Sequence, residues 1–163
     1  KLDRAEPLYR EALGGRREVL GDANPNTLVS LVSLSSLLLD RGRFQEVLEL
    51  LRPAEATARE LFTNGNSEML AALLTVLGRA CLGLSDDGGQ FVLAEAYLLE
   101  AQGIYVELHG LMHKDTLACA SALAQLYETW NTAETGAGYD AKAAEWRAKL
   151  LLPPSSEDDQ ESK

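Results

Sequence analysis

The sequence repeats two helical patterns at a nearly constant interval, and this repeat restricts the folds that the chain can adopt. The interval from Ala12 to Ala54 is 42 residues, and the interval from Ala54 to Ala101 is 47 residues. Each of these residues has a small partner seven positions earlier, namely Ala5, Val47 and Ala94. The second pattern lies between these copies, as Leu34-Ser35, Leu77-Gly78 and Leu123-Ala124. Two alternating patterns at one period predict stacked antiparallel helix pairs, which is an all-α solenoid.

Hydrophobic spacing and end signals together predict about seven helices. Asn24 is a suitable N-cap before Pro25, and Gly21 and Gly42 are suitable helix stops. The predicted helices cover residues 3–20, 25–41, 44–62, 67–84, 91–108, 114–129 and 139–151, with enlarged loops at 85–89 and 131–138. Residues 1–151 are expected to form the array, and the charged segment 152–163 is expected to be a disordered tail.

Composition excludes several classes of partner. The formal net charge is −10, which opposes binding to nucleic acid or to an anionic membrane. No apolar run approaches the roughly 20 residues that a membrane-spanning helix needs. Two cysteines in 163 residues form no disulfide framework, which suits a reducing compartment such as the cytoplasm.

The chain begins at Lys1 in the middle of a repeat, so we interpret it as a piece of a longer protein.

Several segments resemble a known repeat family. These are AEPLYREAL at 5–13, VLGDANP at 19–25, RGRFQEV at 41–47 and LHGLMHKDTLACASALAQLY at 108–127. They resemble tetratricopeptide repeats of the 42-residue, kinesin light chain-like type that also occurs in bacterial signalling proteins. The resemblance covers residues 2–151 and implies a protein-binding scaffold without catalytic residues or cofactors.

The resemblance also implies where a partner would bind, because the first helix of each pair in such arrays lines the concave face. The residues at matching positions are Val29, Val32, Ser36, Leu39 and Asp40, then Ala72, Thr75, Arg79 and Leu82, then Ala118, Ser121, Gln125 and Glu128. The kinesin-like pattern has two adjacent asparagines on this helix, but this chain has Val32-Ser33, Thr75-Val76 and Ser121-Ala122 there. The groove is therefore expected to accept a helix or an apolar segment rather than to grip an extended backbone.

Residues with catalytic or metal-binding chemistry are few. His109 and His113 are four residues apart, but Gly110 interrupts the single helical face that a zinc pair would need. Cys81 and Cys119 are expected to be inert packing residues. Trp146 is expected in the core, whereas Trp130 beside an enlarged loop is a candidate for exposure. No hydrolase or phosphate-loop motif is present, so we predict no catalysis, no metal and no cofactor.

Three functional hypotheses follow. The leading one is a non-catalytic interaction module that binds a protein segment in the concave groove. The second is the C-terminal regulatory repeat region of a bacterial serine/threonine protein kinase or similar signalling enzyme. The third is self-association, because an array that opens on the second helix of a pair leaves Leu8 and Tyr9 without a partner helix.

Overall fold

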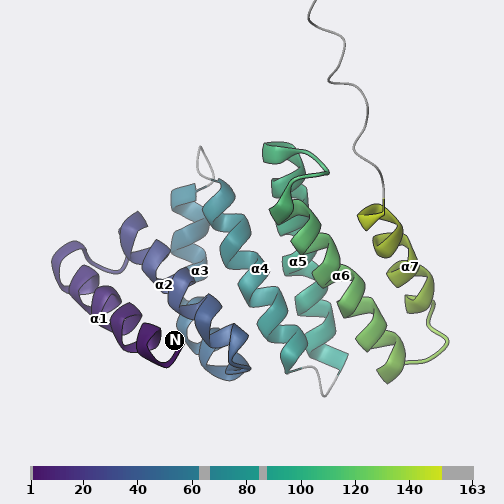
Figure 1. Cartoon of the computed structure of the whole chain (residues 1–163), viewed down its shortest axis with the longest axis horizontal. Helices are drawn as coiled ribbons and strands as arrows, with labels where there is room; N and C mark the ends of the chain where they lie inside the picture. The colour runs from purple at the N-terminus through teal and green to yellow at the C-terminus, as the bar shows by residue number, and fades with distance from the viewer. Residues whose placement is uncertain (1, 63–66, 85–87, 152–163) are drawn as a thin grey trace, which may run out of the picture.

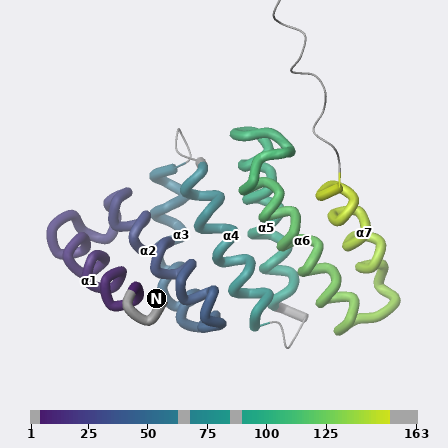
Figure 2. The backbone as a smooth tube through the Cα atoms, viewed as in Figure 1, coloured from purple at the N-terminus to yellow at the C-terminus, as the bar shows by residue number. Residues whose placement is uncertain are grey.

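The computed structural model describes residues 2–62, 67–84 and 88–151, and these residues form a single open row of α-helices (Figures 1 and 2). The helices are α1 (Leu2–Leu20), α2 (Pro25–Asp40), α3 (Phe44–Phe62), α4 (Ser67–Gly83), α5 (Gly88–His109), α6 (Lys114–Ala133) and α7 (Tyr139–Leu150). Consecutive helices pack side by side, with α1 at one end of the row and α7 at the other. The predicted all-α solenoid of stacked helix pairs is confirmed.

Local signals set the ends of several helices. The Asn24 side chain accepts a hydrogen bond from the Asn26 backbone N–H at 2.9 Å, and Pro25 occupies the first turn of α2. Gly21 and Gly42 adopt φ of 82° and 71°, a left-handed conformation in which glycine is favoured over residues with a Cβ atom. These residues let the chain turn sharply between antiparallel helices.

Helix pairs approach closely because small residues lie at the repeat positions. A Cβ atom on Gly78 of α4 would lie 2.7 Å from Leu98 Cγ and 3.3 Å from the Ala94 carbonyl oxygen of α5. Ser35 of α2 and Val47 of α3 are fully buried at the equivalent place in the preceding pair. Ser35, Gly78 and Ala94 therefore lie in the interior, as the sequence predicts, and Leu34 and Leu77 fill the space beside them. The repeated alanines nearer the start of the chain differ, because Ala12 is exposed and Ala54 is only half-buried.

The even-numbered helices lie closer together than the odd-numbered ones. The backbones of α2 and α4, and of α4 and α6, come within 8 Å of each other, whereas those of α1, α3, α5 and α7 do not approach one another in the described chain. Long charged side chains bridge the wider gaps instead, as in the pairs Arg10–Glu46, Arg59–Glu100 and Lys142–Glu95. The even helices thus line the inner side of the stack, and the odd helices form its outer side.

Two predicted boundaries were wrong. Helix α5 begins at Gly88 instead of Phe91, so part of the expected loop at 85–89 is helical. Helix α6 continues to Ala133 instead of ending at Thr129, which shortens the expected loop at 131–138. Helix α6 continues because Trp130 stacks on Phe91 with ring centroids 5.3 Å apart and on Tyr139 at 4.2 Å. This stacking packs the Trp130 ring against α5 and α7, whereas Thr132 and Ala133 after it are exposed.

The same aromatic cluster decides the environment of the tryptophans. Trp130 is only 5% exposed, so its suggested exposure was wrong. Trp146 is half-buried at the edge of the core, where the Lys149 ammonium lies 3.7 Å from the ring centroid. The predicted tail at 152–163 lies outside the described residues, as does most of the expected loop at 85–89.

Candidate functional site

A pocket on the inner side of the stack brings together residues from α2, α4 and α6. Its volume is about 310 Å³, and it lies where the C-terminal halves of α2 and α4 meet the middle of α6. The lining residues are Leu39, Asp40, Phe44, Arg79, Leu82, Gly83 and Gln125. Five of these residues, Leu39, Asp40, Arg79, Leu82 and Gln125, are among the predicted groove residues. The structure thus gathers part of the predicted groove into one concavity.

Two opposite charges border this inner pocket. Asp40 and Arg79 are both exposed, and neither side chain makes a hydrogen bond or an ion pair with another residue in the described part of the chain. Phe44 and Leu82 are half-buried and add apolar surface to the pocket lining. Apolar surface together with an unpaired carboxylate and an unpaired guanidinium suits a partner segment with an apolar side chain and flanking charges.

The other predicted groove residues differ in what they offer a ligand. Val32 and Leu39 are buried, so most of each side chain packs in the core. The hydroxyls of Ser36 and Thr75 donate to the carbonyls of Val32 and Ala71 on their own helices, at 2.9 and 2.8 Å. Val29, Ala118 and Ser121 are exposed, Ala72 is half-buried, and Glu128 pairs with Arg147 at 2.6 Å.

Sequence reasoning missed Phe44 and Gly83 as pocket residues. Phe44 lies at the start of α3, an outer helix, but its ring reaches the end of α4. A Cβ atom on Gly83 would lie 2.5 Å from the Phe44 ring, so the glycine makes room for the ring. Phe44 recurs 47 residues later as Phe91, which is buried, and this recurrence was the signal that could have identified it.

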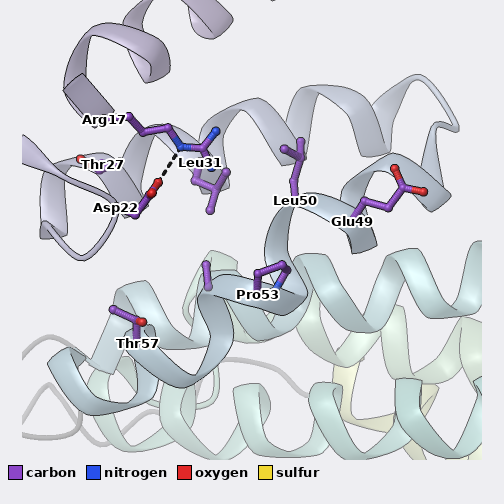
Figure 3. A pocket seen from close by; sticks show the side chains of 9 residues that line it. Arg17, Asp22, Thr27, Leu31, Glu49, Leu50, Pro53 and Thr57 are labelled. Carbon is purple, nitrogen blue, oxygen red and sulfur yellow. Dashed lines mark hydrogen bonds and ion pairs between the residues drawn. The ribbon is translucent and has the colours of Figure 1, made fainter.

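A second pocket lies on the outer side of the stack, between α1 and α3 (Figure 3). Its volume is about 300 Å³, and the lining residues are Arg17, Asp22, Thr27, Leu31, Glu49, Leu50, Pro53, Ala54 and Thr57. The Arg17 Nε atom donates to the Asp22 carboxylate at 2.7 Å, while Leu50 and Pro53 present apolar surface. No sequence pattern indicates this pocket, because it arises from the spacing of two outer helices.

The histidine and cysteine side chains take part in stacking, hydrogen bonding and packing within the fold. The turn at Gly110 stacks the His109 and His113 rings with centroids 4.2 Å apart, and His113 Nδ1 accepts a hydrogen bond from the Asp115 N–H at the start of α6. Among the described residues, no three metal-ligating side chains converge. Burial raises the pKa of the Cys119 thiol to about 11, and burial also raises the pKa of Cys81. Both thiols therefore stay protonated and unreactive at neutral pH.

Comparison with known families supports one repeat unit directly. Residues 1–26 match the family model of the tetratricopeptide repeat, which covers α1 and the turn into α2. Repeats of this family generally bind protein partners and generally carry no catalytic residues. No curated protein matches the chain. None of the described helices combines the length and apolar character needed to cross a bilayer.

Proposed function

We propose that this chain is a non-catalytic scaffold that binds a segment of a protein partner along the inner face formed by α2, α4 and α6. The observation that carries the proposal is the inner pocket, in which Asp40 and Arg79 are unpaired beside the apolar Phe44 and Leu82. A helix or short apolar segment with charged residues on either side of its anchor matches this surface. Val29, Ala118 and Ser121 are exposed predicted groove residues outside the pocket, and we propose that they extend the binding surface along the stack.

Reversing the charge of Arg79 is expected to abolish this binding. Peptides would first be selected on the wild-type protein from a random display library, and their affinities would then be measured by fluorescence anisotropy. Arg79→Glu places two carboxylates together in the pocket, so we expect at least about tenfold weaker binding. Glu60→Arg, an exposed charge reversal on the outer helix α3, is the matched control and should leave the affinity unchanged. Selected peptides that bind Arg79→Glu as tightly as wild type would refute the inner-groove proposal.

A second candidate function is self-association through α1. Leu8 is 65% exposed and Val19 is 81% exposed, and Tyr9 and Leu20 are also exposed. The residues 42 positions after Tyr9 and Leu20 are Leu51 and Phe62, which are buried in α3. The same helical positions are therefore covered in α3 and uncovered in α1, which favours contact with a second copy.

The oligomeric state tests this candidate. We expect wild type to dimerise with increasing concentration in static light scattering, and we expect Tyr9→Glu with Leu20→Glu to remain monomeric. Because both side chains are exposed, these substitutions should not perturb the fold, and far-UV circular dichroism checks this. A wild-type protein that stays monomeric at millimolar concentration would contradict self-association.

A regulatory role beside a bacterial kinase domain is a separate proposal, and a parent gene without a catalytic domain would remove it.

A further inference from the structure

The two gaps between outer helices, α1 to α3 and α3 to α5, are equivalent by the internal repeat. An interval of 42 residues takes Leu2–Leu20 onto Phe44–Phe62, which are the bounds of α1 and α3. An interval of 47 residues takes the end of α3 at Phe62 onto the end of α5 at His109. By these intervals Arg17 corresponds to Arg59, and Pro53 corresponds to Glu100.

In the gap between α3 and α5, Arg59 holds two carboxylates. Its Nε atom donates to Glu55 at 2.9 Å, and its Nη1 and Nη2 atoms donate to the two carboxylate oxygens of Glu100 at 2.5 and 2.9 Å. This bidentate geometry is the strongest arrangement that an arginine and a carboxylate can adopt. Because Glu100 comes from the next outer helix, the pair closes the gap.

In the gap between α1 and α3, Arg17 has one carboxylate partner but none from the next outer helix. The Arg17 Nε atom donates at 2.7 Å to Asp22 in the turn after α1, whereas Arg59 Nε donates to Glu55 on its own helix, at the position that Leu13 takes in α1. The two Nη atoms of Arg17, however, donate to no other residue in the described ranges. Pro53 stands in the place of Glu100 and offers no side-chain acceptor, and the outer pocket of about 300 Å³ opens beside it (Figure 3).

We propose that this outer pocket binds a carboxylate side chain of a protein partner, held by both Nη atoms of Arg17 as Glu100 is held by Arg59. Residues flanking that carboxylate in the partner pack against the apolar surface of Leu50 and Pro53. The site lies on the outer side of the stack, so it is distinct from the inner groove. The chain therefore carries a second binding surface that recognises an acidic residue next to apolar ones.

The chemistry of the pocket selects a protein segment over a free carboxylate. Arg17 is partly exposed, and an exposed ion pair alone changes affinity by only about fivefold at most. A free carboxylate would gain no more than this pair, because the carboxylates of Asp22 and Glu49 also line the pocket and repel a further negative charge. A partner segment also removes the apolar surfaces of Leu50 and Pro53 from water, and this burial adds to the ion pair.

The test uses two capped peptides and the full chain. The probe is acetyl-Ala-Leu-Glu-Leu-Ala-amide, and its control has glutamine in place of glutamate. Binding is followed by the NMR signal of the Arg17 Nε–H group during titration. We expect the glutamate peptide to shift this signal and the glutamine peptide to bind about fivefold more weakly. Equal binding of the two peptides would overturn the proposal.

Substitutions at Pro53 provide the matched control in the protein. Pro53→Glu supplies a carboxylate at the position that Glu100 occupies in the next gap, so it should pair with Arg17 and remove the preference of about fivefold for the glutamate peptide over the glutamine peptide. Pro53→Gln has the same size as Pro53→Glu and loses the same apolar surface, but it adds no charge, so it should still bind the glutamate peptide more tightly than the glutamine peptide. Both variants remove a proline from a helix interior, which favours the helix and preserves the fold. A Pro53→Glu protein that binds like wild type would also overturn the proposal. The Arg79→Glu variant tests the inner groove separately.

Discussion

Leu77→Ala is expected to lower the free energy of unfolding by about 2–5 kcal/mol, the range measured for buried leucines truncated to alanine. Leu77 is fully buried in α4, near the centre of the row, and belongs to the hydrophobic core. The loss combines the transfer free energy of the deleted methyl groups with the cost of the cavity left behind. In a stack of repeats, the rigid neighbours on both sides limit how far that cavity can collapse.

Urea unfolding followed by far-UV circular dichroism measures this effect over all the helices. Tryptophan fluorescence would report mainly on one end of the row, because Trp130 and Trp146 both lie near that end. The matched control is Leu99→Ala, which removes the same atoms from an exposed position on α5. Its effect should stay within about 0.5 kcal/mol, as for most surface substitutions. Equal effects for the two leucines would show that α4 does not carry the core. Leu34→Ala in α2 is expected to behave like Leu77→Ala, since Leu34 is equally buried.

The fold was predictable from the sequence because it depends on local and periodic signals. The intervals of 42 and 47 residues reproduce the bounds of α3 and the end of α5, since each repeat contacts mainly its neighbours. The end of α6 was not predictable in the same way. It depends on the stacking of Trp130 with Phe91 and Tyr139, which come from three different helices.

The candidate sites were predictable only in part. Asp40 and Arg79, which line the inner pocket, could be predicted because the resemblance indicated which helix face lines the groove. The outer pocket depends on a gap between α1 and α3 that no local pattern encodes. Its cause becomes visible only when Pro53 is compared with Glu100, and that comparison needs the hydrogen bonds of Arg59.

The close approach of α4 and α5 gives the second large stability effect, on substitution of Gly78 by alanine. The new Cβ atom would lie 2.7 Å from Leu98 Cγ, and Leu98 is fully buried, so it has no open space to move into. Overpacking of this kind costs about 1–3 kcal/mol. Alanine also favours a helix interior over glycine by up to about 1 kcal/mol, which offsets part of the loss.

Gly103→Ala separates these two contributions. Gly103 lies inside α5 with no atom within 4 Å of its potential Cβ position, so alanine there should stabilise the protein by about 0.5–1 kcal/mol. The same substitution is thus expected to raise the urea midpoint at Gly103 and to lower it at Gly78. Gly78→Val adds two more methyl groups at the contact and should lower the midpoint further. If Gly78→Ala instead stabilised the protein as much as Gly103→Ala, the two helices would not touch at this point, and small residues at the repeat positions would not explain how the stack is held together.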